Sequence, residues 1–427
     1  MTDRAHTRQA LRELAADLDE LLAVSDAQLA TGYPGESGGA QPVHTVYVPA
    51  HKFGADTVRL WGSQALAALE EFASGPADFA AAFDLRPELA EQVLPLVFSK
   101  LATRPIEDLR IDFEDGYGTR SDGTEDSHAR AAARALTAVL SGDGAPWFAG
   151  LRCKSLEAKT RRRAIKTIDE FLGAFWENGV DLPPGFLITL PKVTSAAQVS
   201  AMTVLCQRFE SAYGVRHPRQ LSFEIQVEMP QLIVGPDGAA TIAQCVRAGR
   251  GRLVGLHYGT YDYSAALGVS VAYQSLEHPA ADYAKAVMQV AAAGTGVRVS
   301  DGSSNVLPVG TREEVIGAWR LHARLVRRSL ERGFYQGWDL HPAQLVSRYA
   351  ATYGFYREGL GVATGRLRAY AERAAVGLEE PATGRALAGY LCRAVDCGAV
   401  TEAEVTARTG LDRSDLSSVR RRGTMPV

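Results

Sequence analysis

The chain has 427 residues, 46% hydrophobic and 22% charged, a composition typical of a folded globular protein. Its net charge of -3 provides no overall field that would favour nucleic acid or an anionic membrane as a partner. Five scattered cysteines without a Cys-x-x-Cys spacing argue against a disulfide framework or a zinc site, and the absence of a signal peptide or long apolar run predicts a cytoplasmic protein.

Secondary structure is predicted first as a helix over 8–30, followed by a Gly/Pro/Ser-rich linker over 31–42. From there on, short apolar runs of strand length alternate with longer helical patterns. The predicted strands are 44–50, 109–114, 147–152, 186–191, 221–228, 252–258, 296–300 and 336–341. The predicted helices are 55–75 with a further helical region to 101, then 127–140, 157–177, 195–213, 238–249, 278–293 and 312–332.

Alternation of strands and helices predicts a parallel sheet, and eight such units predict a (β/α)8 TIM barrel. A doubly wound open sheet is the alternative, but the segment HKFGAD after the first strand lacks the Gly-rich turn that this fold would favour. We expect an N-terminal helix and linker, a catalytic barrel with an insert after strand one, and a C-terminal extension of three or four helices. Their predicted bounds are 1–42, 43–345 with the insert at about 51–108, and 346–427.

Polar residues stand at the C-terminal ends of seven predicted strands, whereas the N-terminal ends mostly lack them, with Glu224 as the main exception. Catalytic groups of a TIM barrel lie at the C-terminal strand ends, so this pattern predicts a site there. The residues are Glu114 with Asp115, Arg152, Lys192, Glu228, Asp262, Asp301 and His341.

Carboxylates that converge from different strands need a positive charge between them, and a hard divalent cation is the simplest one. Glu228 and Asp262 suit direct Mg²⁺ ligands, and Glu114 and Asp115 would then bind the waters of the metal. The alternatives are an ion pair of Glu228 with a neighbouring Lys or Arg, and a helix N-cap for Asp262.

Three further residues at these strand ends have more than one interpretation. Arg152 would clamp a substrate carboxylate bidentately or form an ion pair with Glu114. Lys192 could form a Schiff base in a metal-free aldolase, but an amine among acids stays protonated, which disfavours this role. For His341, packing competes with a role in substrate binding or as a base.

Eight segments together resemble the HpcH/HpaI aldolase and citrate lyase β-subunit family of the phosphoenolpyruvate/pyruvate barrel superfamily. Their order and spacing agree with this family over about 45–345. The segments are VYVPA (46–50), IDFEDGYG (111–118), LRCK (151–154), LPKV (190–193), VEMPQLI (227–233), YGTYDYSAALG (258–268), VSDG (299–302) and LHPAQL (340–345).

The resemblance implies a Mg²⁺-dependent carbon–carbon lyase or aldolase, with Mn²⁺ as an alternative metal, that acts on a small 2-oxo or hydroxy acid through a metal-stabilised enolate. The substrate would be a free acid or a CoA thioester, and the protein would be a homo-oligomer. The implied metal ligands are Glu228 and Asp262, the catalytic residues Arg152, Glu114 and Asp115, and the substrate-binding residues Arg152, Gly259, Thr260 and Tyr261.

The chain departs from the family pattern at several points. About sixty residues separate strands one and two, Lys154 stands where the family has Asn, and a long tail follows residue 345. We therefore predict a divergent member. The alternative functions are a mutase or hydrolase of the phosphonopyruvate or oxaloacetate type on the same barrel, and a non-catalytic binding subunit.

Overall fold

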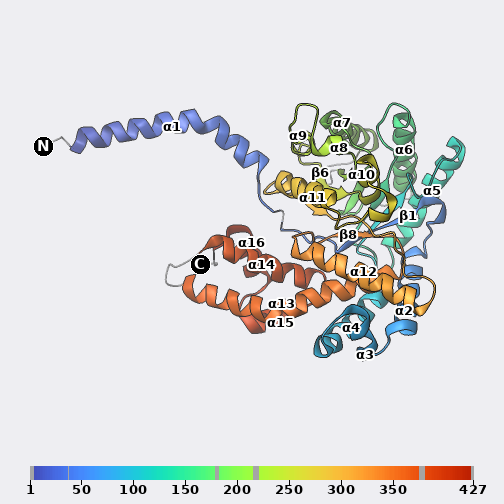
Figure 1. Cartoon of the computed structure of the whole chain (residues 1–427). Helices are drawn as coiled ribbons and strands as arrows, with labels where there is room; N and C mark the ends of the chain where they lie inside the picture. Colours follow the sequence, from blue (N-terminus) through green and yellow to red (C-terminus); the bar gives the residue numbers. More distant parts are fainter. Residues whose placement is uncertain (1–3, 37, 178–181, 215–220, 375–379, 425–427) are drawn as a thin grey trace.

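The computed structural model describes residues 4–424 except 37, 178–181, 215–220 and 375–379. All eight predicted strands form, close to their predicted bounds, in a single parallel sheet (Figure 1). The strands are β1 His44–Pro49, β2 Asp108–Asp112, β3 Phe148–Arg152, β4 Phe186–Leu190, β5 Ser222–Val227, β6 Leu253–Tyr258, β7 Arg298–Ser300 and β8 Gly337–Asp339.

The sheet closes into a barrel. Its strand order is β7-β6-β5-β4-β3-β2-β1-β8, so β1 pairs with both β2 and β8, which excludes the doubly wound alternative. Two backbone hydrogen bonds join the ends of this order: Asp301 N donates to Gln336 O at 2.8 Å, and Trp338 N donates to Gly302 O at 3.1 Å. The predicted (β/α)8 barrel is therefore confirmed.

Helices follow the strands and form the outer layer (Figure 1). The predicted helical region after strand one divides into three helices because Pro76 and Pro87 each begin a new one, at the position where a missing N–H costs nothing. The barrel helices are α2 Thr57–Ala73, α3 Pro76–Phe83, α4 Pro87–Thr103, α5 Asp122–Leu140, α6 Arg161–Glu177, α7 Ala196–Tyr213, α8 Pro230–Ile233, α9 Thr241–Ala248, α10 Thr260–Ala266, α11 Pro279–Ala292 and α12 Arg312–Glu331. Short 3-10 turns form at Ala50–Lys52 and Val271–Tyr273.

The insert after β1 packs on the outside of the barrel against α12 and the C-terminal helix α13 (Gln344–Ala374). Phe83 of α3 contacts Trp319 of α12, with ring centroids 5.5 Å apart. The hydroxyl of Tyr349 in α13 donates to Pro105 O, just after α4, at 3.0 Å. The insert thereby links the barrel to the C-terminal extension.

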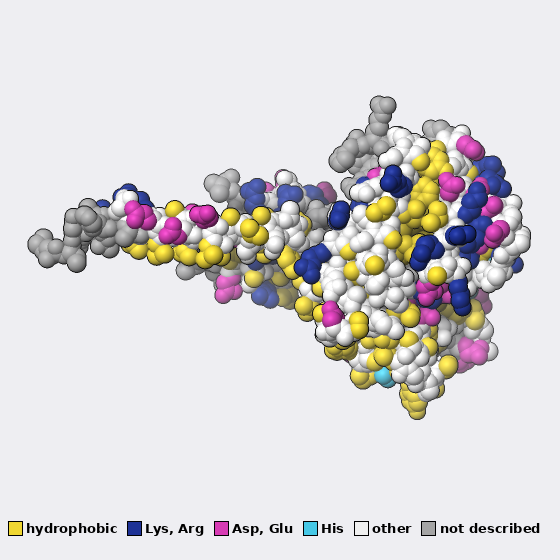
Figure 2. Space-filling model, turned by 90° about the horizontal axis from the view of Figure 1, so that it is seen from above, with side chains coloured by type: hydrophobic (Ala, Val, Ile, Leu, Met, Phe, Trp, Pro, Cys, Tyr) yellow, Lys and Arg dark blue, Asp and Glu magenta, His cyan; other side chains and the backbone are white. Residues whose placement is uncertain are grey.

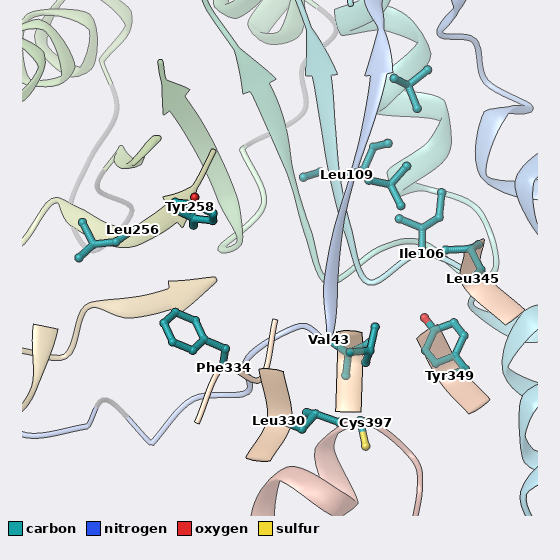
Figure 3. Close-up of a cluster of buried hydrophobic side chains, with 14 of the residues drawn as sticks. Val43, Ile106, Leu109, Leu256, Tyr258, Leu330, Phe334, Leu345, Tyr349 and Cys397 are labelled. Carbon is teal, nitrogen blue, oxygen red and sulfur yellow. The ribbon is translucent and has the colours of Figure 1, made fainter. Parts of the chain in front are cut away.

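The C-terminal extension shares a hydrophobic core with the barrel. Its first helix, α13, is a single helix of 31 residues. Figure 3 shows Val43 before β1, Leu330 of α12, Tyr349 of α13 and Cys397 of the extension among the buried side chains of this core. The remaining helices are α14 Pro381–Asp396, α15 Glu402–Thr409 and α16 Arg413–Arg422.

The N-terminal helix α1 (Arg4–Gly32) extends away from the rest of the chain (Figure 1). Its leucines lie along one side, where Leu11 and Leu21 are 59% and 74% exposed (Figure 2). Among the helices that the structure describes, none combines the length and the apolar character needed to span a bilayer.

A buried charged network fills the interior of the barrel near the start of the strands. Arg110 of β2 forms ion pairs with Asp108 of the same strand and, at 2.9 Å, with Glu224 of β5. Glu224 also lies 3.0 Å from His257 Nε2, and His257 Nδ1 accepts from Trp338 Nε1 at 3.2 Å. The exceptional Glu224 thus has a structural partner, Arg110, that the sequence analysis did not identify.

Asp339, the last residue of β8, joins four elements and is fully buried. Its oxygens lie 2.9 Å from His44 Nδ1 of β1, 3.3 Å from His322 Nε2 of α12 and 2.8 Å from Arg348 Nη2 of α13. Burial alone would raise the pKa of Asp339, but Arg348 and the two histidines outweigh it and hold the pKa well below its usual range.

We expect Asp339→Asn to lower the free energy of unfolding at pH 7 by about 2–3 kcal/mol, because charged hydrogen bonds at a buried position are lost. A carboxylate with a depressed pKa stabilises the fold above its unfolded pKa of about 3.9, and this contribution is lost as the pH falls through the folded value. The difference in the free energy of unfolding between parent and variant should therefore become smaller below about pH 4. Urea unfolding at pH 7 and pH 3.5 measures this free energy. An equal difference at both pH values would contradict the role of Asp339.

Candidate active site

The turn after β2 is organised by Asp112, the last residue of that strand. Its carboxylate accepts from Glu114 N at 2.9 Å and from Gly116 N at 2.8 Å. A Cβ at Gly116 would lie 2.7 Å from Asp112 Oδ2, so this close approach requires glycine. The turn fixes Glu114 and Asp115 at the C-terminal end of the barrel.

Arg152 at the end of β3 forms a bidentate ion pair with Asp112. Nε and Nη2 each lie 2.7 Å from an Asp112 oxygen, while Nη1 lies 3.2 Å from Glu114 Oε2. Burial would lower the pKa of Arg152, but Asp112 and Glu114 outweigh it and raise the pKa well above its usual value. The ion pair with Glu114 predicted as an alternative therefore exists, and only Nη1 lies beyond the clamp on Asp112.

Lys192 after β4 stands at the centre of four carboxylates, Glu114, Asp115, Glu228 and Asp262, which we call the acidic cluster. Its Nζ lies 2.6 Å from Asp262 Oδ2, 3.1 Å from Asp115 Oδ2, 3.4 Å from Glu114 Oε1 and 3.6 Å from Glu228 Oε1. Burial would lower the pKa of Lys192, but Glu228 and Glu114 raise it above its usual value. A protonated amine has no lone pair for a Schiff base, so the geometry disfavours that alternative.

The backbone at Lys192 is held in the left-handed region, with φ at 54°. Such a conformation is unfavourable for a residue with a side chain and needs support from its surroundings. That support comes from Glu228, whose Oε1 accepts from Lys192 N at 2.7 Å. One contact thus fixes both the lysine and the glutamate.

Glu228 after β5 is almost fully buried, whereas the side chain of Asp262 in α10 is 44% exposed. Burial, which Lys192 opposes and nearby Asp262 reinforces, raises the pKa of Glu228 to about 7. Burial likewise raises the pKa of Glu114 to about 8. Lys192, together with Arg152 beside Glu114, does not offset the burial of these two carboxyl groups. Further cationic charge would favour their ionised forms.

Carboxylate oxygens are the ligands that Mg²⁺ prefers, so the acidic cluster fits such an ion. Among the residues described, no group of three or more His, Cys, Asp or Glu side chains is arranged to hold a metal by itself. Mg²⁺ typically uses one or two carboxylates and completes its coordination with water and substrate oxygens. Glu228 and Asp262 therefore stay the predicted ligands.

The segment Gly259-Thr260-Tyr261 adjoins the cluster, and its side chains have internal partners. A Cβ at Gly259 would lie 2.5 Å from Glu228 Cβ, so glycine leaves room for the glutamate. Thr260 Oγ1 donates to Ser303 O at 3.1 Å, and the hydroxyl of Tyr261 accepts from Asn305 N. The substrate contacts expected for this segment stay predictions.

The structure bears on two alternatives from the sequence analysis, the N-cap role of Asp262 and the packing role of His341. Gly259, not Asp262, is the N-cap of α10, because Asp262 lies inside the first turn and contacts Lys192. His341 Nδ1 accepts from Ala343 N at 3.2 Å, within the turn that leads into α13. Burial lowers the pKa of His341.

The chain was compared with known proteins both by sequence and by fold. Residues 22–424 match the family described as a domain of unknown function, DUF6986. The chain belongs to this family. No curated protein matches the sequence of this DUF6986 protein.

Solved structures resemble the DUF6986 barrel at low identity. A citrate lyase from Burkholderia xenovorans LB400 is 18% identical, with a TM-score of 0.57 over 89% of this chain and 99% of that one. A malate synthase from Haloferax volcanii in complex with magnesium and glyoxylate is 13% identical, with a TM-score of 0.49 over 73% and 75% of the two chains. CitE from Mycobacterium tuberculosis, in complex with magnesium and pyruvate, is 16% identical, with a TM-score of 0.43 over 74% and 91%. The Burkholderia structure confirms the predicted family resemblance at the level of the fold.

Sequence reasoning missed two residues next to Arg152 in this DUF6986 protein. Asp112 was not among the predicted site residues, yet its carboxylate clamps Arg152. Gln226 of β5 lies with Oε1 3.4 Å from Arg152 Nη1, and its buried Nε2 has no hydrogen-bond partner among the described residues. The two-residue period of a strand places Glu224, Gln226 and Glu228 on one face, and this signal could have found Gln226.

Proposed function

We propose that this protein is a Mg²⁺-dependent carbon–carbon lyase or aldolase acting on a small 2-oxo or hydroxy acid. The observation that carries the proposal is the position of Glu114, which lies 3.2 Å from Arg152 Nη1 and 3.4 Å from Lys192 Nζ. A guanidinium donor thus adjoins a set of carboxylates suited to a cation. A 2-oxo acid needs this combination, because its carboxylate suits an arginine and its two adjacent oxygens suit a metal.

We assign a role in metal binding, substrate binding or charge balance to each residue of the site. Glu228 and Asp262 would hold the metal, and Arg152 Nη1 would bind the substrate carboxylate with help from the unpaired amide of Gln226. When bound, Mg²⁺ would stabilise the negative charge that develops on the oxo oxygen during carbon–carbon cleavage. Lys192 would balance the charge of the carboxylates around it.

Glu114 is the group of the cluster best suited to hold a proton. Without a metal, burial raises the pKa of Glu114 to about 8, so at neutral pH a large fraction of its side chain carries a proton, which bound Mg²⁺ would help to release. It lies between Arg152 and Lys192, next to the position proposed for the substrate. A cytoplasmic location, a homo-oligomeric state and the use of a CoA thioester stay predictions.

The function is tested with oxalate, a mimic of the pyruvate enolate, by titration calorimetry with Mg²⁺ or with EDTA. We expect the parent protein to bind oxalate only with Mg²⁺, and Glu228→Gln to bind it about 100-fold more weakly or not at all, since one metal ligand loses its charge. Glu313→Gln on α12 is the matched control, because Glu313 is an exposed acid outside the cluster, and it should bind like the parent. Binding that is independent of Mg²⁺, or unchanged in Glu228→Gln, would refute the metal site.

A further inference from the structure

A cavity lies at the opposite end of the barrel from the acidic cluster. It has a volume of about 800 Å³ and is bounded by linker residues 34–36, 39 and 41, by residues around the start of β7, and by α14 and α16. In Figure 1 the linker passes between α11 and these C-terminal helices, and Gly35 N donates to Gly294 O at 2.8 Å. Cavities of this size typically bind small molecules.

Positive charge dominates the wall of this cavity, which we call the arginine pocket. Glu36 is its one lining carboxylate among the residues described. Glu36 forms ion pairs with Arg420 Nη2 at 2.7 Å and with Arg393 Nη2 at 3.2 Å. The lining arginines are Arg298, Arg385, Arg393, Arg420 and Arg421. Five guanidinium groups thus face a single acid.

Two of these arginines keep donor capacity that the described residues do not use. Arg393 stacks on the ring of Tyr335 at 4.1 Å, and its buried Nε has no hydrogen-bond partner among the residues described. Arg298 is half-buried, lies over the ring of Phe148 at 4.7 Å and donates from Nη1 to the backbone oxygen of Ala40 at 3.3 Å. A buried guanidinium donor without an acceptor is costly, and an anion would remove that cost.

Four glycines also line the cavity, and Gly35 among them borders open space. Gly35, Gly294, Gly296 and Gly333 line it with positive φ values between 75° and 85°. A Cβ at Gly35 would meet nothing within 4 Å. A ligand can therefore approach the backbone there while the arginines contact its charged groups.

We propose that the arginine pocket binds a small molecule that carries a pyrophosphate or several phosphate groups, and that Glu36 competes with this ligand for Arg393 and Arg420. Phosphate oxygens match the planar, forked donors of guanidinium groups, and several phosphates are needed to balance the charge of this wall. The site lies at the N-terminal end of the strands, so it is independent of the proposed lyase function.

Inorganic pyrophosphate is the probe, titrated into the full chain at constant ionic strength with EDTA present, so that no metal bridges it to the acidic cluster. We expect saturable binding that weakens about tenfold in Arg421→Gln and in Arg385→Gln, because each loses one charged contact. Both side chains are exposed at the cavity, so their loss should leave the fold intact. Glu36→Gln should bind more tightly than the parent, since the internal competitor loses its charge.

Arg422→Gln is the matched control, because it removes a charge from the same helix without lining the cavity. It should bind pyrophosphate like the parent, and so should Glu228→Gln, which separates this test from that of the lyase function. The absence of saturable binding, an equal loss in Arg422→Gln and Arg421→Gln, or weaker binding in Glu36→Gln would overturn the proposal. Citrate binding as tightly as pyrophosphate would overturn its preference for phosphate.

Discussion

The Arg152→Met variant should unfold with a free energy about 3–5 kcal/mol below that of the parent protein, and it should no longer bind oxalate. Arg152 is almost fully buried and holds both oxygens of Asp112 at 2.7 Å. Its removal leaves Asp112 with only backbone donors and Glu114 without its arginine partner, and a buried carboxylate without a counter-charge is strongly destabilising. Urea unfolding and oxalate calorimetry with Mg²⁺ measure the two effects separately.

A double variant distinguishes the structural role of Arg152 from its proposed role in binding. Asp112→Asn together with Arg152→Met removes both charges, so it should recover part of the lost stability. Oxalate binding should stay absent, because the donor Nη1 is still missing. If oxalate binding returned together with the stability, Arg152 would act only as a structural partner of Asp112.

The sequence predicted the fold well because the signals for it are local. Strand-length apolar runs, helical spacing and their alternation all act over a few residues, and they placed eight strands correctly. For the C-terminal extension only the number of helices was predicted. The pattern of α13 is interrupted by glycines, which weaken a helix without always ending it, so its length of 31 residues does not follow from local signals. Packing against α4, α12 and α14 supports this helix, and such contacts between distant segments leave no periodic signal.

The candidate site was predicted as a set of residues, and its pairings were not. Strand ends indicated Glu114, Arg152 and Glu228, because the ends of parallel strands meet at one face of a barrel. The central position of Lys192 depends on a left-handed backbone that Glu228 holds in place, a contact across 36 positions of sequence. The clamp between Asp112 and Arg152 spans 40 positions, and nothing in either strand alone identifies it.

The charged network near the start of the strands also depends on contacts between residues far apart in the sequence. Arg110 and Glu224 are 114 positions apart, and each interrupts a run of apolar residues with a charge. Considered without its partner, either charged residue would suggest a functional site or an error in the predicted strand. The structure resolves this, because Arg110 also donates from Nε to Thr189 Oγ1 at 3.0 Å, and Thr189 Oγ1 donates to Glu224 Oε1 at 2.6 Å. These contacts join β2, β4 and β5, and Glu224 continues the network to His257 of β6.

Arg110→Met should lower the free energy of unfolding by about 5 kcal/mol, the upper end for a broken buried ion pair, because it leaves both Asp108 and Glu224 without their common partner. Methionine fills a similar volume, so the loss reflects charge more than a cavity. Arg59→Met is the control: the Arg59 ion pair with Asp56 lies in solvent, and its removal should leave the urea midpoint unchanged.

A triple variant with Arg110→Met, Asp108→Asn and Glu224→Gln should recover much of the stability, since no buried charge then lacks a partner. A loss below about 1 kcal/mol in Arg110→Met would show that the interior carboxylates are neutral and that this network does not hold the strands together.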